Sequence, residues 1–157
     1  SSEEADVVVR LTADCPLHDP EIIDDVVSAY NDRSHEVDYL SNTLNRTFPD
    51  GLDVEVFSFK ALSRADREAV TPFHREHVTP YIYRSRDGVE SPFRIAQHKG
   101  MVDFSHLRWT VDEKEDYLLV KAIYEELYSH NPAFGWMDIV SLVTRDPRLL
   151  QLNSHLA

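Results

Sequence analysis

The spacing of hydrophobic positions changes along the chain in a way that predicts alternating strands and helices. Residues 6–11 (DVVVRL) form a short β-branched run that is typical of a buried strand, and we expect other strands to flank it, some of them outside this chain. After a loop, Asp19 and Pro20 supply the N-cap and the first position of a helix. Apolar residues recur at helical spacing from there to Tyr30, so this part of the chain is a strand–loop–helix unit.

The middle of the chain continues this alternation. A second strand is predicted at residues 37–40, and residues 49–51 (PDG) are a turn signal. Residues 52–56 then alternate apolar and acidic side chains, which predicts a strand with one core face and one polar face. Further elements are predicted as helices at residues 60–70, 72–83 (disturbed at Pro80), 112–128 and 138–144, and as strands at 93–96 and 107–110. The pattern indicates a layered α/β sheet in a single domain, residues 1–157.

The helix predicted from residue 112 has a well-marked start. Asp112 and Glu115 have the D-x-x-E spacing of a capping box, with Asp112 as the N-cap. The main apolar stripe of this helix is formed by Tyr117, Val120, Tyr124 and Leu127.

Composition narrows the classes of partner. The 157 residues are 42% hydrophobic, which is ordinary for a globular domain, and no apolar run approaches the roughly 18 residues of a membrane helix. With 16 Lys and Arg against 28 Asp and Glu, the net charge of −12 argues against nucleic acid and anionic membranes as partners. The single cysteine, Cys15, excludes internal disulfides and fits a cytoplasmic location, which we expect.

Glycine usage limits the kinds of nucleotide site. The four glycines are Gly51, Gly88, Gly100 and Gly135. No two of them are close enough for a Gly-rich phosphate loop, in which the backbone must approach the phosphates. Any nucleotide site built by these residues alone lacks that cradle.

Two aspartates lie where a metal could bind. Asp14 follows the first strand, and ligands of open α/β sheets bind beyond the carboxyl ends of strands. Asp112 lies at the start of the late helix. If the two met, they and substrate phosphates would form an ordinary Mg²⁺ site, although each could equally be a turn or helix cap.

The other candidates are weaker. Asp50, Asp53 and Glu55 form an acidic strip that could bind the vicinal hydroxyls of a sugar, or could be a solvated strand face. His74 and His77 lack a third ligand and the H-E-x-x-H order, so they are poor evidence for zinc.

Four sequence blocks, taken together and in order, resemble one family. They are residues 9–20 (VRLTADCPLHDP), 46–57 (RTFPDGLDVEVF), 75–82 (REHVTPYI) and 107–116 (LRWTVDEKED). They resemble the cytidylyltransferases of the spore-coat polysaccharide type, which are relatives of the enzymes that activate acidic sugars such as KDO and sialic acid as CMP-sugars.

The resemblance implies a fold, a reaction and site residues. The implied fold is a three-layer α/β/α sandwich of the nucleotide-diphospho-sugar transferase type, and the implied reaction transfers CMP from CTP to a sugar with Mg²⁺ and releases pyrophosphate. Asp14 and Asp112 match the catalytic metal ligands. The residues implied near the sugar or the phosphates are Arg10, Asp50, Asp53, Glu55, Glu76, His77 and Arg108. CTP and a sugar are the implied partners, and such enzymes are often homodimers.

One departure from the family matters. The family opens with a basic, Gly-containing loop that grips the nucleotide, and that loop would precede Ser1. We therefore expect an N-terminally incomplete fold, the C-terminal part of such an enzyme, carrying metal and sugar sites and inactive in isolation. The alternatives are a non-catalytic sugar- or partner-binding module that kept the fold, and an unrelated Mg²⁺-dependent phosphohydrolase using the same aspartates.

Overall fold

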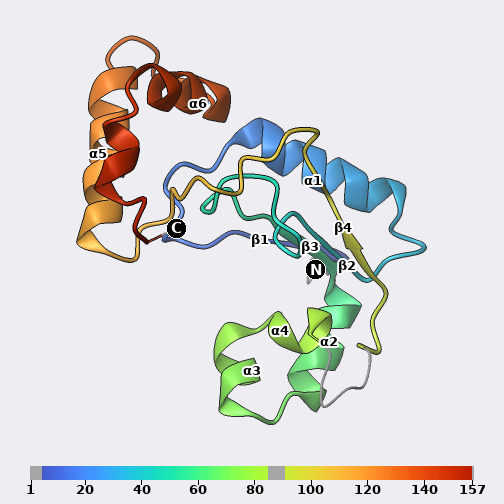
Figure 1. Cartoon of the computed structure of the whole chain (residues 1–157). Helices are drawn as coiled ribbons and strands as arrows, with labels where there is room; N and C mark the ends of the chain where they lie inside the picture. Colours follow the sequence, from blue (N-terminus) through green and yellow to red (C-terminus); the bar gives the residue numbers. More distant parts are fainter. Residues whose placement is uncertain (1–4, 85–90, 157) are drawn as a thin grey trace.

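A mixed four-stranded sheet lies at the centre of the computed structural model, which describes residues 5–84 and 91–156. The strands are β1 (Val7–Arg10), β2 (Tyr39–Ser41), β3 (Glu55–Ser58) and β4 (Ile95–Gln97), in the order β1-β3-β2-β4. Strand β3 is antiparallel to both of its neighbours, whereas β2 and β4 are parallel. The α/β prediction is thus confirmed, as a mixed sheet (Figure 1).

Helices cover both faces of the sheet. They are α1 (Pro20–Asp32), α2 (Phe59–Glu68), α3 (Pro72–His77), α4 (Pro80–Tyr83), α5 (Lys114–Leu127) and α6 (Trp136–Arg145), followed by the 3-10 helix η1 (Leu149–Leu152). In Figure 1, α1 lies over one face, and α2 with α4 lies on the other. The described helices include none that is long and apolar enough to cross a membrane.

Two cores form because the central strands are buried on both faces. Leu40 and Val56 join the larger core, which includes α1, α5 and α6. Their neighbours Tyr39 and Phe57 point the other way, into the smaller core with α2 and α4. Successive side chains of a strand point to opposite faces, so a strand covered on both sides needs apolar residues at nearly every position.

Strand β1 is an edge strand in the described sheet, so within these residues it is not the buried strand that the sequence predicts. It pairs with β3 alone among the described strands, and the side chains of Val7 and Val9 are 38% and 41% exposed. A run of apolar β-branched residues indicates that a strand forms, but it does not indicate how many strands pair with it, because that depends on the whole sheet.

Residues 107–110 do not form the predicted strand. Their only ladder contact is an isolated parallel bridge between Arg108 and Asp50, among the described residues. The segment is instead held against the predicted turn, where Gly51 has φ +106° and lies so close that a Cβ would be 2.5 Å from the Thr110 nitrogen. Glycine is therefore required there both by its φ and by the close approach of two backbones.

The helix predicted from Pro72 through Tyr83 is divided in two. Helix α3 ends at His77 and α4 begins at Pro80, so the predicted disturbance separates the two helices. Val78 and Thr79 lie between the two helices, and Val78 has a φ of +66°.

The start of α5 is displaced by one residue from the prediction. Its N-cap is Glu113, whose backbone N–H donates to the Asp116 carboxylate at 3.1 Å, so Asp112 and Glu115 are not the capping pair. The predicted apolar stripe is also wrong in part, because Tyr117 is 56% exposed and Tyr124 is 38% exposed. The buried positions of α5 are Asp116, Leu119, Val120 and Ile123. Apolar residues occur on more than one side of this helix, and its packing against α6 and η1 selects the buried side.

Asp19 joins the starts of α1 and α6. It is the predicted N-cap of α1, and its Oδ1 accepts the Glu21 backbone N–H at 2.8 Å. Its Oδ2 accepts the backbone N–H of Trp136, the first residue of α6, at 2.7 Å. One buried carboxylate thus satisfies backbone donors of two helices, which otherwise have no partner within their own helix.

We expect Asp19→Ala to destabilise the protein by about 2–3 kcal/mol, because it removes a cap and leaves a second N–H without its acceptor. The free energy of unfolding in urea measures the loss. Asp19→Asn keeps one side-chain oxygen and should lie between Asp19→Ala and the unaltered protein. A stability of Asp19→Ala within about 0.5 kcal/mol of the unaltered protein would contradict the linking role.

Candidate functional site

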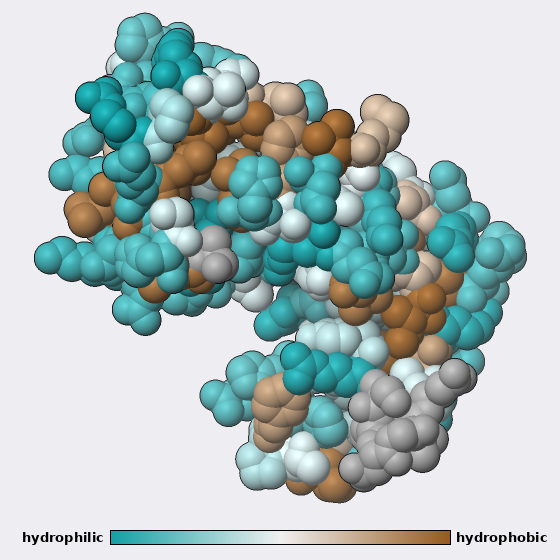
Figure 2. Space-filling model, viewed as in Figure 1, coloured by the Kyte–Doolittle hydropathy of each residue, from teal (hydrophilic) through white to brown (hydrophobic). Residues whose placement is uncertain are grey.

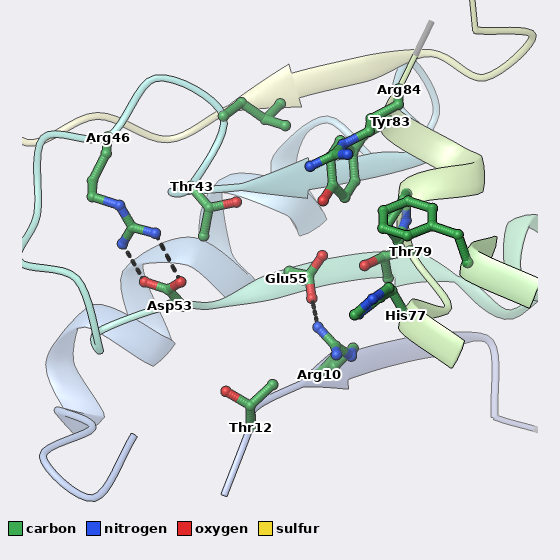
Figure 3. A pocket seen from close by; sticks show the side chains of 13 residues that line it. Arg10, Thr12, Thr43, Arg46, Asp53, Glu55, His77, Thr79, Tyr83 and Arg84 are labelled. Carbon is green, nitrogen blue, oxygen red and sulfur yellow. Dashed lines mark hydrogen bonds and ion pairs between the residues drawn. The ribbon is translucent and has the colours of Figure 1, made fainter. Parts of the chain in front are cut away.

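A cavity of about 860 Å³ lies between the sheet and the α3–α4 pair. Figure 2 shows the surface hollowed between the lobe that contains α2–α4 and the rest of the molecule. Figure 3 shows side chains from both sides directed into this space. Its polar lining consists of Arg10, Thr12, Thr43, Arg46, Asp53, Glu55, His77, Thr79, Tyr83 and Arg84.

The structure brings four of the predicted substrate-binding residues to this cavity. They are Arg10, Asp53, Glu55 and His77. Antiparallel pairing of β1 with β3 places Arg10 opposite Glu55, and α3 carries His77 to the same space. The exposed Glu76 is next to His77 in sequence but is not part of the lining.

Glu55 is the buried centre of this side of the cavity. It is only 6% exposed, so the alternative of a solvated strand face is wrong at this position. One carboxylate oxygen accepts the Tyr39 hydroxyl at 2.6 Å, and the other forms an ion pair with Arg10. Burial, followed by the charge of Glu55, raises the pKa of Tyr39 far above its ordinary value. Tyr39 therefore stays a neutral hydrogen-bond donor.

Arg46 organises the acidic strip. Its guanidinium pairs with both carboxylate oxygens of Asp53, at 2.9 Å for Nη2–Oδ2, and it lies 3.2 Å from Asp50. Burial alone would lower the pKa of Arg46, but these carboxylates outweigh it and raise the pKa. For Asp50, burial is the largest influence and raises the pKa of the carboxyl. All three acids predicted to bind sugar hydroxyls are thus already paired with an arginine, Asp50 and Asp53 with Arg46 and Glu55 with Arg10.

Arg84 differs from the other arginines of the cavity. Its guanidinium carbon lies 5.3 Å from the centre of the Phe73 ring and 5.9 Å from that of Tyr83. No carboxylate pairs with it in the part of the chain that the structure describes. Among the residues that the structure describes, the lining therefore contains three guanidinium groups against two carboxylates, in a protein of net charge −12. Such a cavity suits an anion.

The two predicted metal ligands lie on loops that touch. The Asp14 carbonyl accepts the Val111 backbone N–H at 2.8 Å and the Thr110 hydroxyl at 3.3 Å. Asp112 is the next residue, so Asp14 and Asp112 lie on adjoining segments. A hydrogen bond from the Thr12 side chain is the main cause that lowers the pKa of Asp14, which keeps this exposed carboxylate ionised. Within residues 5–84 and 91–156, no three His, Cys, Asp or Glu side chains cluster as a metal site.

Arg108, predicted to contact phosphate or substrate, is held by the chain's own acids. Its guanidinium lies 2.6 Å from Asp112, 2.9 Å from Asp116 and 3.4 Å from Asp50. The fully buried Asp116 also accepts the Asn153 amide at 2.9 Å. Burial opposes ionisation of Asp116, but Arg108 and Asn153 outweigh it, so the pKa of Asp116 lies well below its ordinary value. Arg108 thus ties α5 and η1 to the segment that precedes them.

Sequence reasoning missed Arg46, Arg84, Asp116 and Asn153. Arg46 lies only four residues from Asp50 in the chain, and this closeness of opposite charges could have indicated an ion pair. Asn153 had no comparable signal, since its partners Arg108 and Asp116 are 45 and 37 residues away.

With the fold and site described, the chain can be placed among known proteins. A sequence model of the cytidylyltransferase family matches residues 1–130, and the chain belongs to that family. It is 32% identical over 150 residues to the spore coat polysaccharide biosynthesis protein SpsF of Bacillus subtilis, covering 90% of this chain and 56% of that protein. It is 33% identical over 156 residues to an uncharacterized protein of Methanocaldococcus jannaschii, covering 96% and 58%, respectively.

A solved structure shows the same fold. The structure of a cytidylyltransferase from Leptospira borgpetersenii matches with a TM-score of 0.83 and 31% identity, covering 93% of this chain and 59% of that one. The chain therefore spans a little over half the length of the relatives that it matches.

The Asp116 network predicts a pH dependence of stability. Because the folded-state pKa of Asp116 is lowered, its contribution is complete above the unfolded-state value of about 4 and is lost as pH falls toward the folded-state value. We expect Asp116→Asn to cost about 3 kcal/mol at pH 7 and to flatten the decline of stability below about pH 4. Thermal unfolding from pH 7 to pH 3 measures both effects.

Asp112→Asn is the matched control, because Asp112 pairs with the same arginine but its side chain is 53% exposed. It should change stability by less than about 1 kcal/mol. Equal losses in the two variants would contradict the special role of the buried carboxylate.

Proposed function

We propose that this chain carries the metal- and sugar-binding part of a nucleotidyltransferase that transfers CMP from CTP to a sugar and releases pyrophosphate. Membership of the cytidylyltransferase family supports the reaction class. The sheet with helices on both faces supports a three-layer sandwich of the nucleotide-diphospho-sugar transferase type. A sugar used to make polysaccharide is suggested by the function stated in the name of the Bacillus relative.

The observation that carries the proposal is the cationic cavity in an acidic protein. Arg10 and Arg46 each neutralise a lining carboxylate, whereas Arg84 pairs with none in the described residues. A sugar with a carboxylate would match this surplus charge, because guanidinium groups bind carboxylates through paired, charge-assisted hydrogen bonds. The hydroxyls of the same sugar could bind Thr43 and Thr79 at the cavity wall. We therefore propose an acidic sugar as the substrate.

The residues present fit a magnesium ion shared with the substrate. Mg²⁺ is usually held by one or two carboxylates together with substrate phosphates and water, and Asp14 and Asp112 supply two carboxylates on adjoining segments. When bound, the ion would neutralise the phosphates of CTP. The Asp112 carboxylate also lies 2.6 Å from Arg108, so Arg108 would hold this ligand in place.

The chain's own residues then position the reacting groups. A sugar oxygen forms a bond to the α-phosphorus of CTP while the bond from that phosphorus to the leaving pyrophosphate breaks. Such a reaction needs alignment and charge neutralisation and no covalent nucleophile on the protein. Burial raises the pKa of Cys15 to about 11, so its thiol stays protonated and is a poor nucleophile.

A second candidate function is a non-catalytic sugar-binding module. It is favoured by one observation: neither Asp14 nor Asp112 lines the cavity, so sugar binding there does not require the metal site. Release of pyrophosphate that requires both CTP and a sugar distinguishes the transferase from this module. It also distinguishes the transferase from a phosphohydrolase, which needs no sugar acceptor.

We expect Arg84→Gln to weaken binding of a sugar acid by about tenfold or more, because one charge-assisted contact is removed. Titration calorimetry with KDO measures the affinity. Arg94→Gln is the control, because Arg94 is exposed, pairs with Asp38 at 2.9 Å and lies outside the lining. Equal affinities of the two variants would contradict the assignment of Arg84.

For the nucleotide, we expect Mg²⁺-dependent binding of CTP that Asp14→Asn abolishes, because the substitution removes a metal-binding charge. Titration calorimetry of the chain with CTP, with and without Mg²⁺, measures this. Asp24→Asn changes an exposed aspartate of α1 and should bind as the unaltered chain does. A folded chain that binds no CTP would show that these residues do not form a nucleotide site by themselves.

A further inference from the structure

The turn between α3 and α4 has an unusual backbone at Val78. Its φ of +66° and ψ of −69° are those of a γ-turn with positive φ, a rare and strained conformation. The Thr79 backbone N–H donates to the His77 carbonyl at 2.8 Å, which is the hydrogen bond that closes such a turn. Val78 is the single non-glycine residue with positive φ among the described residues. For a β-branched residue this φ is a clear outlier.

Packing of the Val78 side chain does not account for the strain. The side chain is 37% exposed and belongs to neither core, so little burial offsets the backbone cost. The surroundings hold the turn instead, since the Val78 N–H donates to the His74 carbonyl at 3.1 Å and the buried Thr79 is the N-cap of α4. Strained conformations persist where neighbouring structure over-determines them, and they concentrate at functional sites.

The two residues that flank Val78 both line the cavity. His77 is the last residue of α3, and Thr79 is the N-cap of α4 (Figure 3). Helix α3 has no buried residue, so core packing does not fix its direction. Its other attachments include an exposed ion pair between Arg75 and Asp66, at 2.7 Å, and the contact of Phe73 with Arg84. The His74 ring also meets the ring of the buried Tyr81 of α4 edge-on, with ring centres 5.5 Å apart. The turn joins α3 to α4 directly and therefore contributes to where the α3 wall of the cavity stands.

We propose that Val78 is a positioning residue, whose strained γ-turn holds His77 and Thr79 against the cavity for binding of an anionic sugar. The proposal rests on the function proposed above, because it assigns the turn to the same site. In this proposal the strained backbone of Val78 lowers the stability of the folded protein but fixes the positions of His77 and Thr79. Glycine populates positive φ freely, so Val78→Gly releases the strain and also removes the restriction that holds the turn.

The test compares Val78→Gly with Val70→Gly. Val70 is 85% exposed, has an ordinary negative φ and lies outside the cavity lining, so glycine there only adds freedom to the unfolded chain. We expect Val78→Gly to raise Tm by about 2–5 °C, and to weaken binding of KDO by about fivefold or more. Val70→Gly should lower Tm slightly and leave the affinity unchanged.

A raised Tm together with a weakened affinity for KDO in Val78→Gly is the result that a merely structural residue would not give. A lower Tm in Val78→Gly, or an unchanged affinity in a variant with raised Tm, overturns the proposal. NMR of the His77 ring and the Thr79 methyl group gives a readout that does not depend on the ligand. We expect both resonances to shift and broaden in Val78→Gly but not in Val70→Gly.

Failure of the proposed function is distinguishable. If the unaltered chain binds no sugar acid, the substrate assignment fails, and the His77 and Thr79 signals alone decide the role of Val78. Signals that stay unchanged in Val78→Gly then overturn the positioning role, and signals that change support it.

Discussion

The buried carboxylate of Glu55 is the constraint on which the arrangement of the cavity depends. Because β3 pairs with β1 and β2, Glu55 stands opposite Arg10 on one side and Ser41 on the other. A polar side chain that is only 6% exposed needs hydrogen-bonding partners, and Arg10 and Tyr39 supply them for Glu55. The ion pair with Glu55 also fixes the direction of the Arg10 side chain. The pairing of β1 with β3 therefore determines both the strand register and the charges on this side of the cavity.

Two groups of charged residues serve different purposes. Around Arg108, three aspartates surround one guanidinium, and the result is a structural junction between α5, η1 and the preceding segment. In the cavity the balance is reversed, because guanidinium groups outnumber carboxylates among its described lining residues. An acidic protein repels anions at long range, so a local surplus of arginine is what favours an anionic substrate at this position. Asp112 belongs to the first group, so the position of this proposed metal ligand depends on its ion pair with Arg108.

Local signals in the sequence predicted local structure well. The N-cap at Asp19, the turn at Gly51 and most helices follow from side-chain chemistry within a few residues. Predictions that depended on distant partners were less successful. The edge position of β1, the unpaired segment 107–110 and the exposure of Tyr117 all depend on which elements pack against them.

The sequence by itself determined the α/β class, the family resemblance and four residues of the cavity, because family blocks and hydrophobic spacing are written in consecutive residues. Only the tertiary structure decided that Arg108 is engaged internally, that Arg84 is the cation without a carboxylate partner among the described residues, and that Val78 takes a strained turn. The physical reason is that ion pairing and backbone strain depend on distances between groups far apart in the chain. The sequence shows which residues are charged, but the fold determines which of them come close enough to form ion pairs.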